Sequence, residues 1–565
     1  MDIAPEAKET DNTCIDMSHF YTVTKDAHMT ATFRFSLRSA LFAAACSLGL
    51  AVSLPQPVQA QVTAFKQAVA EAAATDADVA AFYRERNYQP IWTAEGETAR
   101  ARRAALLDAL SGASVHGLPE GRYGVNRLKA QMAAVRTTRD LGAVEVALSR
   151  AFVTYAKDVQ TGILTPSQVD KDIKRKVPLH DRRTYLSEFA ESAPQAYLRR
   201  LPPLTHEYRA LMKEKLHFEH LVAAGGWGAT VPGGKLEPGD QGPAVIALRN
   251  RLIRMGYLER SATRTFDKAL EQAVRKFQLA HGLLADGVAG DSTLGEINKS
   301  AEARLKSIVV AMERERWLNH ERGDRHILVN QTDFSAKIID HGRVTFQTRS
   351  VVGMNVHDRR SPEFSDEMEH MIINPSWHVP RSIIVKEYLP KLRENPGAAS
   401  QLIITDSRGR RVNREEADFS QYTGNSFPFD MRQPPGNRNA LGRVKFMFPN
   451  RHNIYLHDTP QKHLFNREVR AFSHGCIRLA DPFDFAYALL APQTDNPKEF
   501  FHRILDTGLE TKVDLKVHLP VHIIYRTAFT DDHGRAQFRR DIYGRDAKIW
   551  SALSGAGVAL GSVQG

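Results

Sequence analysis

The stretch that says most about the fold reads SHGCIRL at residues 473–479, and NIYLHDTP precedes it at residues 453–460. The run from Ile454 to Leu456 is apolar and β-prone, whereas residues 458–460 are typical of a turn. His457 is therefore expected at the end of a strand, where a rigid frame holds its imidazole.

A helix is predicted directly after this stretch. Asp481 and Pro482 supply an N-cap and a first-turn proline. One apolar helical face is expected from the residues at i, i+3, i+4 and i+7, namely Phe483, Ala486, Tyr487 and Leu490. Cys476 is then pinned between a loop and a packed helix, which suits a preorganised site.

The N-terminus has the pattern of a secretion signal behind an extension. Residues 1–28 are polar and are interpreted as an extension that results from a start codon assigned too early. Residues 29–60 are interpreted as a signal peptide. Arginines precede the apolar run Ser39 to Leu54, and small residues end at Ala60. The chain is thus expected in the periplasm; an uncleaved membrane anchor is the alternative.

Cysteine usage singles out one thiol. Of Cys14, Cys46 and Cys476, the first two lie in or before the predicted signal, so the mature chain would keep only Cys476. A lone thiol forms no internal disulfide and is open to oxidation in an exported protein. The alternative is a buried, inert cysteine that packs as a small hydrophobe.

The neighbours of this cysteine fit nucleophilic chemistry. A nearby imidazole or cation must raise the thiolate fraction, and a histidine can take the thiol proton and later protonate a leaving amine. Gly475 allows close backbone approach, and consecutive N–H groups there could hold an oxyanion. Arg478 adds positive charge for a thiolate or a substrate carboxylate. The pattern predicts Cys–His acyl transfer.

Two histidines are candidates for the base. His474 lies two residues from Cys476, so on an extended strand both side chains would face the same side. His457 precedes the cysteine by 19 residues. The residues alone leave either histidine as the base, and a structural role for each remains open.

HDTP followed by SHGCIRL resembles the active-site signature of L,D-transpeptidases with a YkuD-type catalytic domain. The resemblance implies that Cys476 is the nucleophile and His457 the general base. Asp458, where many members have glycine, resembles the large, scaffold-bearing YcbB subgroup. The supporting, oxyanion and substrate residues that it implies are Asp458, Ser473, His474, Gly475, Arg478 and Trp377.

Two further regions resemble parts of that subgroup. Residues 236–300 contain apolar helical stripes and Gly-rich turns that resemble the three-helix peptidoglycan-binding domain. Residues 61–235 are rich in helix-forming residues and resemble the subgroup's helical scaffold domain. His217 and His220 lie three apart without an HExxH motif, so neither a metal nor a cofactor is expected.

The catalytic region is expected over residues 303–525, with a β-hairpin around residues 340–343. A helical capping insertion is expected at about 382–445, and Trp377 before it is a core residue or a substrate platform. No role is assigned to the tail, residues 526–565. The predicted fold is multidomain α+β: a mainly β, YkuD-like β-sandwich, a three-helix module and a helical scaffold domain.

The composition and charge of the chain limit which classes of binding partner are expected. The 565 residues are 42% hydrophobic and 25% charged, with a formal charge of +11 and a pI near 9.4. Lys and Arg are scattered, and no zinc-finger, RNP-type or basic-zipper pattern appears, so nucleic acid is not expected. An anionic cell envelope suits the charge. No envelope protein partner is identified.

These observations predict an exported L,D-transpeptidase that releases D-alanine from a tetrapeptide stem and forms 3-3 cross-links in peptidoglycan. A cysteine L,D-carboxypeptidase is the nearest alternative, because water can also resolve a thioester. A non-catalytic peptidoglycan-binding scaffold is the alternative from another class, and it would need no acyl-enzyme.

Overall fold

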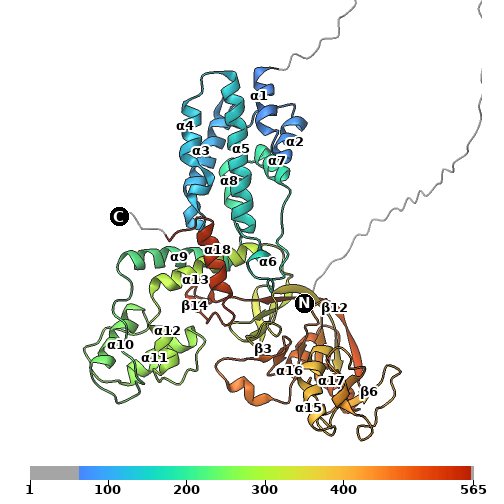
Figure 1. The fold of residues 1–565 in the computed structure, drawn as a ribbon. Coiled ribbons are helices and arrows are strands. Elements are labelled where there is room, and N and C mark those ends of the chain that lie inside the picture. Colours follow the sequence, from blue (N-terminus) through green and yellow to red (C-terminus); the bar gives the residue numbers. More distant parts are fainter. Residues whose placement is uncertain (1–62, 561–565) are drawn as a thin grey trace, which may run out of the picture. The chain divides into compact units, whose positions relative to one another are not determined.

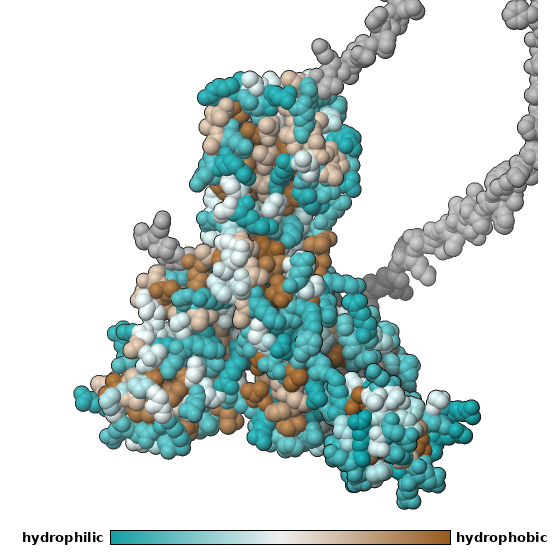
Figure 2. Space-filling model, viewed as in Figure 1, coloured by the Kyte–Doolittle hydropathy of each residue, from teal (hydrophilic) through white to brown (hydrophobic). Residues whose placement is uncertain are grey.

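The computed structural model describes residues 63–560 (Figure 1). The predicted signal peptide, Cys14 and Cys46 lie outside these residues. Within them, no helix is long and apolar enough to cross a membrane. The face in Figure 2 is mostly hydrophilic, with scattered apolar side chains.

The N-terminal region is helical, as predicted. Its helices are α1 (Ala64–Ala73), α2 (Ala77–Glu85), α3 (Glu97–Ser111), η1 (Ala113–His116), η2 (Glu120–Tyr123), α4 (Val125–Ala133), α5 (Thr138–Thr161), α6 (Pro166–Val169), α7 (Arg182–Glu191), α8 (Pro194–Arg200) and α9 (His206–Ala223). The buried Glu145 carboxylate in α5 accepts N–H groups of Ile91, Trp92 and Thr93. This carboxylate fixes the segment from Ile91 to Thr93 against α5.

The next region is the small three-helix module. It comprises α10 (Pro243–Arg254), α11 (Lys268–Ala280) and α12 (Asp291–Ile297). The predicted stripes form its core, which includes Val245, Leu248, Leu252, Leu270, Val274, Phe277, Leu294 and Ile297. The buried Gln278 amide donates to Asp286 Oδ1 and accepts the Gly287 N–H, each within 2.9 Å. That pair of bonds holds the turn at Asp286 and Gly287 against α11.

The catalytic region is a nine-stranded sheet in the order β10-β3-β11-β9-β8-β4-β12-β1-β2. Its strands are β1 (Arg325–Asn330), β2 (Ser335–Asp340), β3 (Arg343–Gly353), β4 (Phe364–Ile373), β8 (Val444–Met447), β9 (Leu456–His457), β10 (Ala471–Ser473), β11 (Ile477–Leu479) and β12 (Thr511–Ile524). Because β2 also pairs with β3, the hydrogen bonding closes on itself. The predicted hairpin joins β2 to β3, and the α+β fold class is confirmed.

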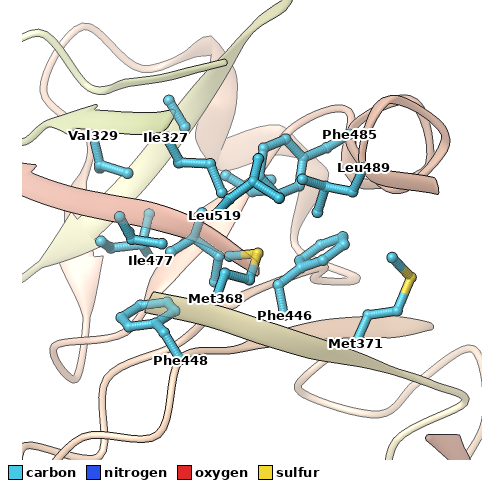
Figure 3. Packing of buried hydrophobic residues seen from close by; sticks show 14 of the residues in the cluster. Ile327, Val329, Met368, Met371, Phe446, Phe448, Ile477, Phe485, Leu489 and Leu519 are labelled. Carbon is cyan, nitrogen blue, oxygen red and sulfur yellow. The ribbon is translucent and has the colours of Figure 1, made fainter. Parts of the chain in front are cut away.

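The core of this sheet meets helices α16 (Pro482–Leu490) and α17 (Pro497–Leu505). Figure 3 shows Phe485 and Leu489 gathered with strand side chains such as Phe446. The predicted face of α16 was therefore partly wrong: Phe483 and Tyr487 are only partly buried. The N-cap was also wrong in detail, since the side chain of Asp481 accepts from Thr348 Oγ1 at 2.8 Å and caps no helical N–H.

The insertion between β4 and β8 has its own sheet, in the order β5-β7-β6, and its own core. Its elements are β5 (Trp377–His378), α14 (Arg381–Ile383), the π-helix η3 (Ile384–Tyr388), α15 (Leu389–Glu394), β6 (Ile403–Thr405), η4 (Phe419–Gln421) and β7 (Asp430–Gln433). It therefore begins before residue 382, and residues 444–447 belong to the main sheet instead.

The C-terminal segment is folded, although no role was predicted for it. It forms β13 (Ala528–Thr530), β14 (Ala536–Phe538) and α18 (Arg545–Gly555), and α18 packs on α13 (Ala301–Trp317). The buried Glu363 carboxylate pairs with Arg314 of α13 at 2.7 Å and with Arg545 of α18 at 3.2 Å. Segments from both ends of the catalytic region thus meet on one buried carboxylate beside β4.

Candidate active site

The pairing of β9 with β11 brings the two halves of the motif together. These strands are parallel, with Ile477 opposite Leu456 and Arg478 opposite His457. A parallel pair needs a crossover of about a dozen residues or more. Residues 458–476 supply it, through η5 (Lys462–Asn466) and β10. The 19-residue spacing therefore places Cys476 at the start of β11, beside the strand that ends in His457.

A cleft of about 1190 Å³ opens over these strand ends, between the main sheet and the insertion. Its lining includes six residues singled out from the sequence: Trp377, His457, Ser473, His474, Cys476 and Arg478. Asp458 and Gly475 do not line the cleft, so they contribute to the site only by positioning the residues that do. The described residues hold no group of three or more His, Cys, Asp or Glu that could bind a metal ion.

His457 is buried, with 4% of its surface exposed. Its Nδ1 lies in hydrogen-bond contact with the carbonyl of Asp458. An Nδ1–H donating to that carbonyl leaves Nε2 with a lone pair, the arrangement that a base needs. Burial, and next the positive charge of Arg478, lower the pKa of His457 to about 3. The imidazole is therefore neutral at physiological pH and able to accept a proton.

Asp458 holds this arrangement through its own backbone. One carboxylate oxygen, Oδ1, accepts the Thr459 N–H and the Lys462 ammonium, each at 2.7 Å. The other, Oδ2, accepts the Arg443 N–H at 2.8 Å. These bonds tie the Asp458 peptide to two segments, so the carbonyl that orients His457 is fixed.

The Cys476 thiol is partly exposed and donates to the carbonyl of Asn453 at 3.4 Å. Burial raises the pKa of the thiol to about 11, against the lowering effects of hydrogen bonds from Tyr455 and of the charges on Arg478 and Lys445. With the thiol protonated and His457 neutral, the resting pair carries no charge. Proton transfer then accompanies attack on a substrate.

The backbone before the cysteine turns sharply at Gly475, whose φ is +118°. The backbone from His474 to Cys476 is therefore not an extended strand, and the prediction that both side chains face the same side of one is wrong. Ser473 Oγ contacts the Cys476 carbonyl and accepts the Gly475 N–H at 3.1 Å. The expected run of consecutive oxyanion donors is thus interrupted, because Gly475 is already bonded. Across residues 63–560, the His474 and Cys476 N–H groups find no protein acceptor.

His474 faces the insertion. Its Nε2 contacts Glu387 Oε1 in the π-helix, and the same carboxylate pairs with Arg359 at 2.8 Å. Trp377 lines the cleft and also packs in the insertion core, where its ring lies 6.4 Å from that of Tyr388. Trp377 is thus a core residue of the insertion that also lines the cleft, and its role as a substrate platform stays a prediction.

Three residues near the site escaped the sequence analysis: Lys445, Tyr455 and Glu387. Lys445 pairs with His457 across β8 and β9, and Tyr455 hydrogen-bonds to the thiol. Tyr455 stands inside the quoted strand, two residues before His457, so its position was a usable signal. Lys445 and Glu387 are distant in sequence from this motif, so the motif contained no signal for either of them.

Comparison with known families agrees with this geometry. Residues 324–518 match the L,D-transpeptidase catalytic domain family YkuD, residues 77–214 match the scaffold domain family, and residues 241–297 match a family described as a peptidoglycan binding domain. The chain therefore carries a YkuD-type L,D-transpeptidase catalytic domain together with a scaffold domain. The family resemblance seen in the sequence is confirmed.

Particular relatives match over part of their length. A protein of Haemophilus influenzae named as an L,D-transpeptidase is 33% identical over 227 residues, which is 40% of this chain and 45% of that protein. The N-acetylmuramoyl-L-alanine amidase CwlM of Mycobacterium tuberculosis is 30% identical over 136 residues, which is 22% of this chain and 31% of CwlM. The matches thus span less than half of either relative.

Two solved structures also match. L,D-transpeptidases from Xylanimonas cellulosilytica and Stackebrandtia nassauensis are each 15% identical and each cover 53% of this chain, with 98% and 97% of their own chains covered. The TM-scores are 0.16 and 0.21, which are too low to carry an argument.

Gly442 provides a test of how Asp458 is held. A Cβ there would lie 2.2 Å from Asp458 Oδ2, at a φ of +64°. We expect Gly442→Ala to destabilise the protein by about 1–3 kcal/mol more than Gly409→Ala, because the clash adds overpacking to backbone strain. Gly409 is the matched control, with a φ of +78° and nothing within 4 Å of its Cβ. Equal melting temperatures in calorimetry would contradict the packing described for Asp458.

The raised pKa of Cys476 predicts the pH dependence of its alkylation. Only the thiolate reacts, so with a pKa of about 11 the rate of labelling by iodoacetamide should still be rising at pH 10. An ordinary thiol levels off above its pKa of about 8.5. Arg478→Met removes a lowering charge and should shift the curve to higher pH, whereas Arg438→Met, also in the cleft, should not. The readout is the mass of the peptide that carries Cys476; a plateau below pH 9 would refute the prediction.

Proposed function

We propose that this chain is an exported L,D-transpeptidase that forms 3-3 peptidoglycan cross-links by acyl transfer through Cys476. The observation that carries the proposal is the β9–β11 pairing, which places a cysteine and a neutral, oriented histidine on the floor of one cleft. The YkuD-type catalytic domain supports the reaction class. The peptidoglycan-binding module supports the substrate.

The first half-reaction forms a thioester. Cys476 Sγ attacks the carbonyl carbon of the third, diamino acid residue of a tetrapeptide stem, and the thiol proton passes to Nε2 of His457. The N–H groups of His474 and Cys476, which have no acceptor among the described residues, suit the developing oxyanion. The C–N bond then breaks, and His457 returns its proton to the amine of the departing D-alanine.

The second half-reaction resolves the thioester. The side-chain amine of a neighbouring stem attacks the acyl carbon, and His457 accepts the proton that the amine loses. The C–S bond breaks, and His457 protonates the departing sulfur, which restores the resting thiol. The products are one D-alanine and one cross-linked dimer, so the reaction needs no external oxidant or reductant.

Product analysis with a disaccharide-tetrapeptide tests this proposal. We expect one D-alanine released for each cross-linked dimer, and no product with Cys476→Ala. His457→Gln should lower kcat by about 10²–10⁴-fold, the usual worth of a general base. His474→Gln keeps an amide that can reach Glu387 and should lose much less activity, because His474 faces the insertion.

Other outcomes of this experiment would indicate a different function or a different general base. Free tripeptide without dimers would indicate an L,D-carboxypeptidase. No product at all, with peptidoglycan binding intact, would indicate a non-catalytic scaffold. A larger loss in His474→Gln than in His457→Gln would move the role of base to His474.

Export is part of the proposal. The pattern of residues 29–60 supports a signal peptide cleaved after Ala60, and the substrate lies in the envelope. We expect the protein recovered from the periplasmic fraction to begin at Gln61, as read from its intact mass. A full-length chain in the membrane fraction would indicate an uncleaved anchor, and a chain confined to the cytoplasm would contradict export.

A further inference from the structure

Three side chains from neighbouring strands form a row across the floor of the cleft. Lys445 in β8 is directly opposite His457 in β9, and His457 is directly opposite Arg478 in β11. Residues paired in this way present their side chains on the same face of a sheet, about 5 Å apart. All three residues line the cleft. A neutral imidazole is thus flanked by a cation on each side.

Neither flanking cation has an anionic partner in the part of the chain that the structure describes. Lys445 makes no ion pair or hydrogen bond there; its ammonium lies 6.0 Å from the ring centre of Tyr455. Arg478 donates to the neutral amide of Gln461 at 2.6 Å, and its Nε is buried with no partner. By contrast, Lys386 and Arg359 of the same cleft are paired with Asp358 and Glu387.

Burying a cation without a counter-ion is costly, because the lost hydration is not replaced. Burial accordingly lowers the pKa of both Lys445 and Arg478. The same arrangement favours an anion that enters the cleft, since neither Lys445 nor Arg478 forms an ion pair among the described residues, and Glu510 acts on Lys445 only through its charge at longer range. The row therefore has the properties of an anion site.

The position of the row indicates which anion it receives. In the reaction proposed above, His457 protonates the amine of the departing residue. In an amino acid that leaves from the end of a peptide, the amine and the carboxylate are bonded to the same Cα. The carboxylate therefore falls beside the imidazole, within reach of its cross-strand neighbours.

We propose that Lys445, assisted by Arg478, binds the terminal carboxylate of the donor peptide and is the residue that restricts the enzyme to the carboxyl-terminal peptide bond. This inference rests on the proposed acyl transfer. An internal peptide bond, or an amidated end, presents a neutral amide at that position and leaves the two cations without a counter-ion. Lys445 is thus a specificity-determining residue for donors with a free α-carboxylate.

Two donors that differ in one group test the proposal: a tetrapeptide stem ending in D-alanine, and the same stem ending in D-alaninamide. A charge-assisted hydrogen bond contributes about 1.5–3 kcal/mol, so the wild-type kcat/KM should favour the free carboxylate by about tenfold to a hundredfold. Lys445→Met should remove most of that preference by lowering kcat/KM for the carboxylate donor alone. Lys445→Arg should retain it.

The matched control is Lys386→Met, which removes a lysine from the same cleft that is already paired with Asp358. It should leave the preference unchanged. An equal loss on both donors in Lys445→Met, or no preference in the wild type, would overturn the role of Lys445 while leaving the acyl transfer in place. If the wild type consumes neither donor, the proposed function itself fails.

Discussion

The parallel pairing of β9 with β11 is the constraint on which the site depends. Two strands that run side by side in the same direction cannot be joined by a tight turn. The chain between His457 and Cys476 must therefore leave the sheet and return, and on the way it adds β10 at the sheet edge. The return path ends in the turn at Gly475, which places Cys476 just before β11 begins. Backbone hydrogen bonds thus set the positions of Cys476 and His457, the proposed nucleophile and base.

The electrostatics of the site follow from this placement. The two proposed reacting groups are both neutral at rest, because burial raises the pKa of Cys476 to about 11 and lowers that of His457 to about 3. A stable thiolate–imidazolium pair is thereby disfavoured. Such a thiol resists oxidation, since the thiolate is the reactive form. In the proposed mechanism, charge develops only when a substrate occupies the cleft, which the cations Lys445 and Arg478 line.

The sequence predicted what local patterns determine. The strand ending at His457, the helix after Asp481 and the hairpin near Gly342 all depend on residues within a few positions of one another, and each is present. The stripes of the three-helix module were also correct, because a small module leaves only one way to bury them. The chemistry predicted for Cys476 rests on its sequence neighbours and stays a prediction, whereas its place in a cleft beside His457 is observed.

The remainder depends on contacts between distant segments. The sequence beginning at Phe483 has apolar residues on several sides of the helix, so only packing decides that Phe485 faces the core. Ser473 removes the Gly475 N–H from the oxyanion region through a side-chain bond that no periodicity reveals. Only the pairing of β8 with β9 brings Lys445 beside His457, so its place in the site could not be predicted from the sequence.

The most direct test of the account is the intact mass of the protein mixed rapidly with a disaccharide-tetrapeptide donor, followed by peptide mapping. Acyl transfer through Cys476 predicts a transient adduct equal to the donor minus D-alanine, located on the peptide that carries Cys476 and decaying as acceptor is added. Release of D-alanine without any adduct, or an adduct on another residue, would contradict acyl transfer through Cys476.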